Sequence, residues 1–108
     1  MASTDYEVGI LGATGAVGQT FIRLLDDHPW FTVTEVAASE RSAGQSYRKA
    51  EHWLSGQSIP DVVADRTVKP TEPPAMDCDF VFSGLSPPEA GEIEKVFAEA
   101  GVPVISNA

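Results

Sequence analysis

Hydrophobic and polar positions follow two different periods over the N-terminal part of the sequence. Residues 5–11 form a short apolar run that predicts a strand, and residues 31–38 are rich in β-branched side chains and predict a second one. Between them, the apolar positions of residues 15–27 recur at helical spacing. Pro29 ends this helix, because proline disfavours helical backbone at the residue before it. The positions expected on the buried face of the helix are Val17, Phe21, Leu24 and Leu25.

The middle of the sequence is more polar and more irregular. Residues 39–60 are mostly polar, although a short helix is expected near residues 47–54. Residues 61–69 contain three valines and predict a strand, whereas the prolines of residues 70–79 predict a loop. Residues 80–82 form a short, wholly apolar run, which is typical of a central parallel strand covered on both faces.

The strongest helix signal lies in the last quarter of the sequence. Ser86 is a suitable N-cap, Pro87 suits the first helical position, and Glu89 completes a capping box with the serine. Gly101 ends the helix, and residues 102–106 predict a further strand. The apolar face of the helix consists of Ala90, Ile93, Val96, Phe97 and Ala100.

The order of these elements predicts an α/β fold. Strands that alternate with helices over short connections form a mostly parallel sheet with helices on its faces. A sequence of 108 residues has the size of one domain and can bury a modest core. We therefore expect residues 1–108 to form one domain around a doubly wound, mostly parallel sheet.

A glycine-rich segment joins the first predicted strand to the first predicted helix. Residues 12–18 read Gly-Ala-Thr-Gly-Ala-Val-Gly, and a Rossmann-type fold binds the pyrophosphate of a dinucleotide at such a turn. Gly12 would permit a sharp turn, Gly15 would let the backbone approach the phosphates, and Gly18 would let the helix pack closely on the sheet. No Gly-Lys-Ser or Gly-Lys-Thr follows, which argues against ATP hydrolysis. A tight turn without a ligand is the alternative.

The residues after the second predicted strand bear on the choice of cofactor. They read Ser39-Glu40-Arg41-Ser42, and an arginine here accommodates the 2′-phosphate of NADP. Arg41 offers a bidentate contact to that phosphate, and the two serines can donate hydrogen bonds to it. Glu40 would instead favour the 2′-hydroxyl of NAD. On balance the segment favours NADP, and a solvated surface arginine is the alternative.

A third candidate segment follows the apolar run at residues 80–82. Ligands of a doubly wound sheet bind beyond the carboxyl ends of the strands, so Ser83, Gly84 and Leu85 are expected beside the glycine-rich turn. A turn at Gly84 and an N-cap at Ser86 would also account for the segment without a ligand.

Composition argues against several classes of partner and site. The net charge of −9 argues against nucleic acid and anionic membranes as partners. No apolar stretch is long enough to span a membrane, and the first residues lack the pattern of a secretory signal, so a cytoplasmic location is expected. The single cysteine, Cys78, allows no internal disulfide, and no Cys/His cluster has the spacing of a zinc site.

Four segments together resemble aspartate-semialdehyde dehydrogenase, and in particular its archaeal and fungal branch. They are the glycine-rich segment at 12–18, Ala-Ser-Glu-Arg-Ser-Ala-Gly at 38–44, Phe-Ser-Gly-Leu at 82–85 and Val-Ile-Ser-Asn-Ala at 104–108. The resemblance covers essentially the whole sequence but only the N-terminal part of the family's longer chain. It implies a truncated Rossmann-type domain. The absent C-terminal part would carry the catalytic cysteine, the histidine and the substrate arginines, and would form the homo-oligomer.

The resemblance also implies a reaction and a set of binding residues. The family uses NADPH to convert 4-aspartyl phosphate into aspartate 4-semialdehyde, in the route to lysine, methionine and threonine. Cys78 does not match the family's nucleophile, and its neighbours Asp77 and Asp79 are expected to raise the pKa of its thiol. No catalytic residue is therefore expected here, and the isolated chain should be inactive. The residues implied to bind NADP are Gly12, Thr14, Gly15, Ala16 and Val17 at the pyrophosphate, Ser39, Arg41 and Ser42 at the 2′-phosphate, and Ser83, Gly84 and Leu85 beside the ribose and nicotinamide.

Other interpretations stay open. Malonyl-CoA reductase and acetylglutamyl-phosphate reductase share the architecture and the thioester chemistry, although Arg-Ser-Ala-Gly at residues 41–44 makes the second a poorer match. A non-catalytic dinucleotide-binding module would also lack the catalytic residues. Such a module should be stable alone, whereas a fragment of an enzyme would leave its edge strand at residues 102–106 uncovered.

Overall fold

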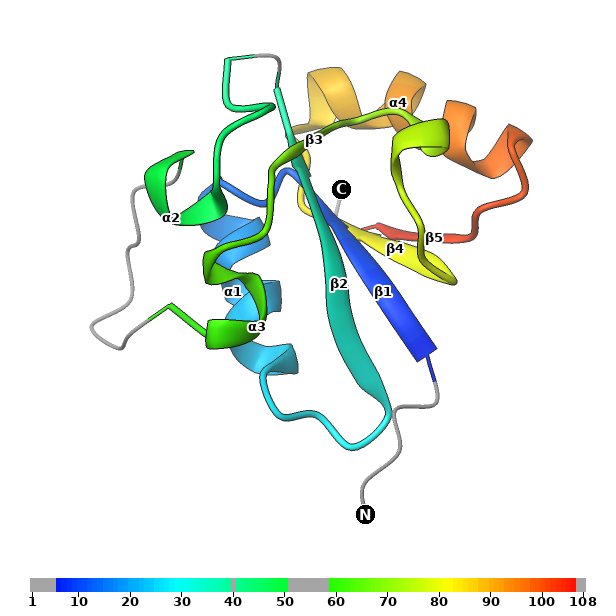
Figure 1. The fold of residues 1–108 in the computed structure, drawn as a ribbon. Coiled ribbons are helices and arrows are strands. Elements are labelled where there is room, and N and C mark those ends of the chain that lie inside the picture. Colours follow the sequence, from blue (N-terminus) through cyan, green and yellow to red (C-terminus); the bar gives the residue numbers. More distant parts are fainter. Residues whose placement is uncertain (1–5, 40, 51–58, 107–108) are drawn as a thin grey trace.

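The computed structural model describes residues 6–39, 41–50 and 59–106, and these build one parallel sheet. The strands are β1 (Tyr6–Leu11), β2 (Phe31–Ala38), β3 (Lys69–Pro70), β4 (Phe80–Ser83) and β5 (Val104–Ser106). Their order across the sheet is β3-β2-β1-β4-β5, and all neighbouring strands pair in parallel (Figure 1). This is the strand order of the Rossmann fold, and the predicted doubly wound sheet is confirmed.

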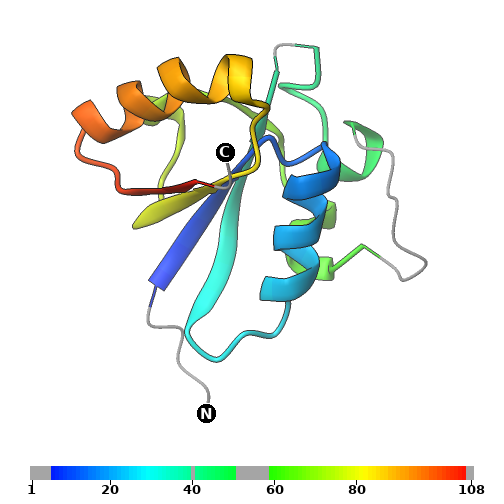
Figure 2. The same cartoon turned by 180° about the vertical axis from the view of Figure 1, so that it is seen from behind.

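Helices cover both faces of this sheet (Figures 1 and 2). They are α1 (Ala16–Leu25), α2 (Tyr47–Ala50), α3 (Asp61–Ala64), the short 3-10 helix η1 (Pro73–Ala75) and α4 (Pro87–Glu99). Helices α1, α2 and α3 lie on one face, and α4 lies on the other with η1. Because all strands run in the same direction, their carboxyl ends meet at one edge of the sheet, where α1 and α4 begin.

Alternate residues of the strands supply two hydrophobic cores, one beneath each layer of helices. Val8 and Ile10 of β1 face α1 and α3, whereas Leu11 faces α4. The first core is built around the buried side chains Val8, Ile10, Ile22, Val33, Val36, Tyr47, Val63 and Val68. The second is smaller and contains Leu11, Ala37, Met76, Val81 and Phe97. Burial on both faces explains why β1 and β4 are almost wholly apolar.

A β-bulge in β2 sets the direction of its side chains. Val8 of β1 pairs with Val33, but the next residue, Gly9, pairs with Glu35, so Thr34 has no opposite residue. The extra residue restores the apolar side chain of Val36 to the core that Val33 lines. It also sends Glu35 to the α4 side, where polar partners lie.

The strand predicted over residues 61–69 is wrong for all of these residues except Lys69. Residues Asp61–Ala64 form α3, in which the backbone N–H groups of Val63 and Ala64 both donate to the carbonyl of Pro60. Proline fixes the backbone at the helix start, and a four-residue turn buries Val63 while leaving Val62 37% exposed. Only Lys69–Pro70 then pairs with β2, as β3.

Helix α1 turns a different face to the sheet than its apolar residues predict, whereas three of the five residues predicted for the buried face of α4 are buried or packed against the second core. In α1 the buried residues are Gly18, Gln19, Ile22 and Leu25, whereas Leu24 is 62% exposed. The backbone contact at Gly18 fixes this rotation, because that side of the helix must approach the sheet. In α4, Ala90 and Phe97 are buried but Val96 is 45% exposed. The remaining members of the predicted faces are Val17, which is 37% exposed, Phe21 and Ile93, which are half-buried, and Ala100, which is exposed.

Three smaller expectations can be compared with the structure: the capping box of α4, the helix near residues 47–54 and the edge strand. The predicted capping box is not seen at the start of α4, since the Ser86 side chain makes no capping hydrogen bond. The Ser86 carbonyl instead accepts the backbone N–H of Ala90. Of the helix predicted near residues 47–54, α2 occupies 47–50, while 51–58 lie outside the described residues. At the sheet's edge, Ile105 of β5 is 49% exposed, as expected for an uncovered edge strand.

Candidate functional site

Three glycines bring the ends of β1 and β4 and the start of α1 into direct backbone contact. Gly12 has a φ of +72°, a conformation that side chains disfavour, and it turns the chain at the end of β1. A Cβ on Gly18 would lie 2.8 Å from the Ala13 Cα, and a Cβ on Gly84 would lie 2.8 Å from the Gly18 nitrogen. Neither position has room for a side chain, so the two segments can pack only as glycine against glycine.

Gly15 differs from these glycines, because neither its backbone conformation nor any neighbouring atom of the described residues requires a glycine there. Its φ of −84° and ψ of 173° are open to any residue, and it is exposed. A Cβ there would meet only the Gly12 carbonyl oxygen, at 3.6 Å, which is an ordinary contact. Gly15 caps the N-terminus of α1, whose first turn holds no acidic residue. A residue without a side chain at a helix N-terminus leaves the backbone N–H groups open to an anion.

These turns form one wall of a groove at the carboxyl ends of the strands. The groove has a volume of about 260 Å³ and lies where β1 and β4, which are not consecutive in the chain, are neighbours. In doubly wound sheets this switch in strand order is where ligands bind. Seven of the predicted binding residues line the groove: Gly12, Thr14, Gly15, Ser39, Arg41, Gly84 and Leu85.

Arg41 brings a positive charge to the groove. It is exposed, and no described carboxylate lies within ion-pair distance of its guanidinium, although the chain has 16 acidic residues. Its own backbone is held, since Gln45 Nε2 donates to the Arg41 carbonyl at 3.1 Å. A fixed backbone and a guanidinium without a carboxylate partner among the described residues suit an arginine that receives a phosphate group. Glu40, which would favour the 2′-hydroxyl of NAD, lies outside the described residues.

Four predicted binding residues do not line the groove. Ala16 and Val17 are exposed in the first turn of α1, beside the groove. Ser42 is half-buried, and its backbone N–H donates to the Ser39 carbonyl. Ser83 is fully buried, and its Oγ accepts the backbone N–H of Leu85 at 3.4 Å. The Ser83 side chain therefore shapes the turn after β4.

Other residues of the site were not foreseen from the sequence. Ala38 and Ser86 line the groove, and two buried polar side chains hold the glycine-rich turn from behind. Tyr47 Oη donates to the Ala13 carbonyl at 2.6 Å, and Gln19 Nε2 donates to the Thr14 carbonyl at 3.0 Å. The available signal for Gln19 was a polar residue one turn after Gly15. For Tyr47 the sequence offered no signal of a role in the site, other than an aromatic residue in a polar stretch.

Cys78 lies on the opposite side of the sheet from α1, against β1. Its Sγ would be 3.1 Å from a Cβ on Gly9, and the side chain is half-buried. Burial, followed by the charges of Glu35, Asp79 and Asp77, raises the pKa of the thiol to about 11. The expected effect of the neighbouring carboxylates is confirmed, and burial contributes more. A thiol of this pKa is protonated near pH 7 and is a poor nucleophile.

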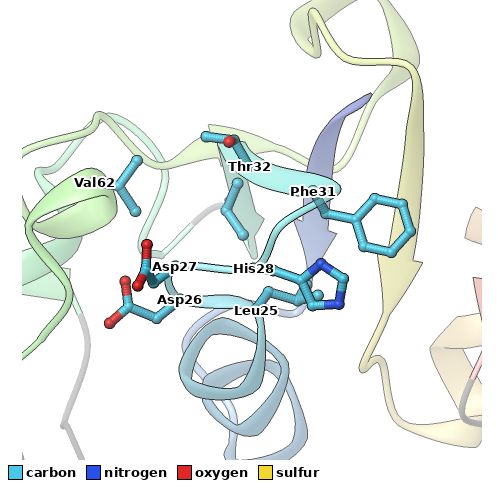
Figure 3. Close-up of a pocket in the computed structure, with 8 residues that line it drawn as sticks. Leu25, Asp26, Asp27, His28, Phe31, Thr32 and Val62 are labelled. Carbon is cyan, nitrogen blue, oxygen red and sulfur yellow. The ribbon is translucent and has the colours of Figure 1, made fainter. Parts of the chain in front are cut away.

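A second hollow, of about 410 Å³, lies near the start of β2 (Figure 3). Its walls include Asp26, Asp27 and His28 after α1, Phe31 of β2 and Val62 of α3. Asp27 has a φ of +57°, which ends the helix. Two neighbouring carboxylates repel phosphate, and this is the end of the sheet away from the strand carboxyl ends. This larger hollow is therefore a poor site for a dinucleotide.

Comparison with known proteins identifies the family of the chain. Residues 7–108 match the family model described as semialdehyde dehydrogenase, NAD binding domain. An aspartate-semialdehyde dehydrogenase from Archaeoglobus fulgidus is 48% identical over 103 residues, which are 95% of this chain and 30% of that protein. One from Schizosaccharomyces pombe is 48% identical over 103 residues, or 94% of this chain and 29% of that protein.

Solved structures give the same picture. The chain superposes with a TM-score of 0.90 on aspartate semialdehyde dehydrogenase with NADP from Candida albicans, at 46% identity, covering 98% of this chain and 30% of the other. Aspartate semialdehyde dehydrogenase II from Vibrio cholerae matches with a TM-score of 0.67 at 28% identity, over 97% of this chain and 32% of the other. The chain thus spans about a third of the length of the relatives it matches. Within the described residues, no helix is long and apolar enough to cross a bilayer.

Proposed function

Since the chain belongs to the semialdehyde dehydrogenase family through its NAD-binding domain, we propose that it binds NADP in the groove at the carboxyl ends of β1, β2 and β4. The observation that carries the proposal is the joint placement of Gly15 and Arg41 on one groove. One is a glycine at a helix N-terminus where a side chain would meet no close atom, and the other is an arginine without a described carboxylate partner.

Each wall of the groove suits a different part of the cofactor. The start of α1 offers backbone N–H groups to the pyrophosphate, with the positive end of the helix dipole behind them, and Gly15 places no side chain in front of them. Arg41 and Ser39 offer a guanidinium and a hydroxyl to the 2′-phosphate. Gly84 and Leu85 border the remaining part, on the β4 side of the turn. NADPH supplies a hydride when bound, and the residues of this chain bind and orient the cofactor.

The whole enzyme's activity is part of the same proposal. Its relatives are aspartate-semialdehyde dehydrogenases, so we propose that this domain serves the NADPH-dependent conversion of 4-aspartyl phosphate to aspartate 4-semialdehyde. Family likeness also supports a role in lysine, methionine and threonine synthesis, a cytoplasmic location, and a homo-oligomer formed by a part of the enzyme other than residues 1–108. The chain's relatives at 45–50% identity carry this name, which favours it over malonyl-CoA reductase and acetylglutamyl-phosphate reductase.

Calorimetric titration of the 108-residue chain with NADP and with NAD tests the cofactor site. We expect tighter binding of NADP, and we expect Arg41→Ala to weaken NADP binding by roughly 10- to 100-fold, as for the loss of a charge-assisted contact. NAD binding should change less than about twofold, because the contact to the 2′-phosphate is absent. Arg23→Ala is the matched control, since Arg23 is an exposed arginine in the last turn of α1.

The outcomes separate the parts of the proposal. Loss of the preference for NADP in Arg41→Ala alone would support the assignment of the 2′-phosphate site. Equal losses in Arg41→Ala and Arg23→Ala would mean that general charge attraction, and no specific site, binds the cofactor. Absence of binding by either nucleotide to a chain with a cooperative melt would overturn the proposed function of this domain.

A further inference from the structure

Tyr47 connects two parts of the proposed cofactor site that are far apart in the sequence. It follows directly on the segment we call the arginine loop, residues 41–46. Its side chain is fully buried, and its hydroxyl donates to the Ala13 carbonyl in the glycine-rich turn at 2.6 Å. A buried aromatic side chain with this hydrogen bond has one fixed position, so it can act as a spacer between the two segments.

The bond from Tyr47 fixes the direction of a backbone N–H that faces the groove. Ala13 and Thr14 share one planar trans peptide unit, in which the carbonyl and the N–H point in opposite directions. Because the Ala13 carbonyl points toward Tyr47, in the core, the N–H of Thr14 points away from the core. Thr14 lines the groove, and no described residue accepts a hydrogen bond from its N–H.

Two further bonds complete the support of the turn. Gln19 Nε2 holds the Thr14 carbonyl at 3.0 Å, and the Ala13 N–H donates to the Ala37 carbonyl of β2 at 2.9 Å. The Ala13 N–H, the Ala13 carbonyl and the Thr14 carbonyl thus each have a hydrogen-bond partner. The turn therefore presents its donors outward without rearrangement when an anion binds, which lowers the cost of binding.

The other side of Tyr47 is tied to the arginine loop. Its backbone N–H donates to the Arg66 carbonyl at 2.8 Å, and the Gly44 N–H donates to the Val68 carbonyl at 2.8 Å. The Gln45 carbonyl accepts the backbone N–H of Val68, and the Gln45 side chain donates to the Arg41 carbonyl. The arginine loop is thus fixed to residues 66–68, and Tyr47 extends from this frame to the glycine-rich turn.

We propose that Tyr47 is a positioning residue for the cofactor, and that its bond to the Ala13 carbonyl holds the glycine-rich turn ready to bind the pyrophosphate. This inference rests on the proposed function, because it concerns the same groove. Tyr47 is not among the residues that line the groove, and it acts through Ala13. The pyrophosphate is common to NADP and NAD, so loss of the hydroxyl should weaken both cofactors by the same factor.

The test compares Tyr47→Phe with Tyr6→Phe, the same substitution at the chain's other tyrosine. Tyr6 is 50% exposed at the start of β1, at the opposite end of the sheet from the groove. Calorimetry with NADP and with NAD should show Kd values roughly three- to tenfold higher for Tyr47→Phe, as expected for one buried hydrogen bond. Their ratio should stay within about twofold of the unmodified chain, and Tyr6→Phe should leave both Kd values unchanged.

Thermal melts of each variant separate positioning from stability. Tyr47→Phe also leaves the buried Ala13 carbonyl without this donor, so a lower Tm is expected in addition to weaker binding. A lower Tm with Kd values unchanged well below that temperature would overturn the inference, and so would a loss confined to NADP. Should Tyr47→Phe fail to fold, Gln19→Met provides a second measurement, since it removes the donor to the Thr14 carbonyl without adding a charge and is expected to weaken both cofactors in parallel. Lack of binding by the unmodified chain would instead count against the proposed function.

Discussion

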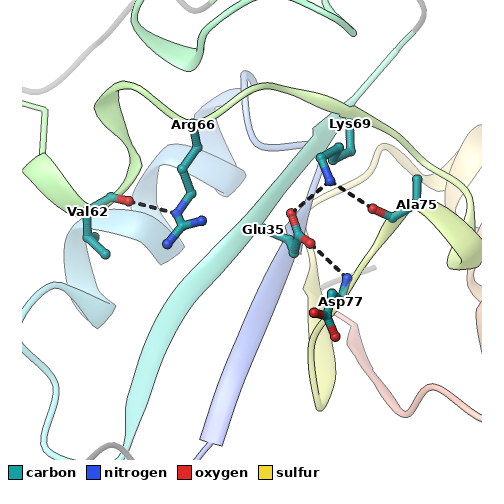
Figure 4. Close-up of polar contacts among 6 residues, drawn as sticks. All are labelled: Glu35, Val62, Arg66, Lys69, Ala75 and Asp77. Atoms are coloured by element: carbon teal, nitrogen blue, oxygen red, sulfur yellow. Dashed lines mark hydrogen bonds and ion pairs between the residues drawn. The ribbon is translucent and has the colours of Figure 1, made fainter.

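Glu35 of β2 and Lys69 of β3 form an ion pair on the α4 side of the sheet, with Lys69 Nζ 3.4 Å from Glu35 Oε1 (Figure 4). The Glu35 side chain is only 11% exposed, and its second oxygen accepts the backbone N–H of Asp77 at 2.8 Å. Lys69 also donates to the Ala75 carbonyl at 3.1 Å. The pair therefore fixes the loop between β3 and β4, in which η1 lies, to the edge of the sheet.

Removal of the lysine should destabilise the fold measurably. We expect Lys69→Met to lower the free energy of unfolding by about 1–2 kcal/mol, because a mostly buried carboxylate then keeps only the Asp77 N–H as a described donor; partial exposure of Lys69 moderates the loss. Urea denaturation measures this change. Arg48→Met is the control, since the Arg48–Asp65 pair is 58% and 86% exposed and should contribute less than about 0.5 kcal/mol. Equal effects of both substitutions would contradict the structural role of Glu35.

Two glycine-to-alanine substitutions should have opposite effects on stability. A Cβ at Gly18 would lie 2.8 Å from backbone atoms of Gly12 and Ala13, which cannot move separately from the sheet, and we expect a loss of about 3 kcal/mol or more. Gly91 lies inside α4, and a Cβ added there would meet no atom within 4 Å, so Gly91→Ala should stabilise by about 0.5–1 kcal/mol. Chemical denaturation of the two variants checks both signs, and a neutral Gly18→Ala would refute the close contact between α1 and β1.

Gly15→Ala should separate folding from cofactor binding. The backbone there suits alanine and a Cβ meets nothing closer than 3.6 Å, so the free energy of unfolding should change by less than about 1 kcal/mol. The new methyl group would occupy the space over which the pyrophosphate is proposed to lie, and NADP and NAD should each bind at least about tenfold more weakly. Calorimetry and a urea titration on the same sample give the two numbers. Full retention of binding would mean that the phosphates lie elsewhere.

Cys78 should make stability depend on pH in the alkaline range. Its pKa in the folded chain is about 11 against 9.0 for the unperturbed thiol, so the unfolded chain releases a proton first as the pH rises. The stabilising effect of this difference is complete below pH 9 and is lost between pH 9 and about 11. Free energies of unfolding should thus decrease more steeply over this interval in the original chain than in Cys78→Ala. Parallel pH profiles would show that the thiol is not shifted.

Much of the fold could be predicted from local sequence patterns, such as β-branched runs, prolines and glycine-rich turns. The strand at Phe31–Ala38 appears with the predicted bounds, because a β-branched run between a proline and polar residues has few other conformations. The start of α4 at Pro87 is also as predicted, since proline is suited to the first helical turn. Seven of the predicted binding residues line one groove because the glycine-rich turn and the strand ends recur in a fixed relation in doubly wound sheets.

The features that were mispredicted depend on distant contacts. The rotation of α1 is set by Gly18 against the Gly12 turn and Gly84, a contact across 66 positions that helical periodicity does not encode. The helix at Asp61–Ala64 is too short to have a period of its own, and its valines fit a strand equally well. Tyr47 could not be assigned to the site, because only the folded chain brings its hydroxyl to Ala13.

The bulge at Thr34 has a further consequence for how β2 tolerates change. The strand consists of two halves in opposite phase: Phe31 and Val33 face α1 in the first, and Val36 and Ala38 face it in the second. Substitutions within either half alter one side chain at a time. If β2 kept all its residues but paired without the bulge, Glu35 would point into an apolar core, and Ala38 and the groove residue Ser39 would turn away from their present directions. Deleting Thr34 should therefore leave these directions unchanged, because it removes only the residue that has no opposite residue in β1. The direction of Ser39 in the cofactor groove thus depends on the pairing register of a strand whose other side chains mostly lie outside the groove.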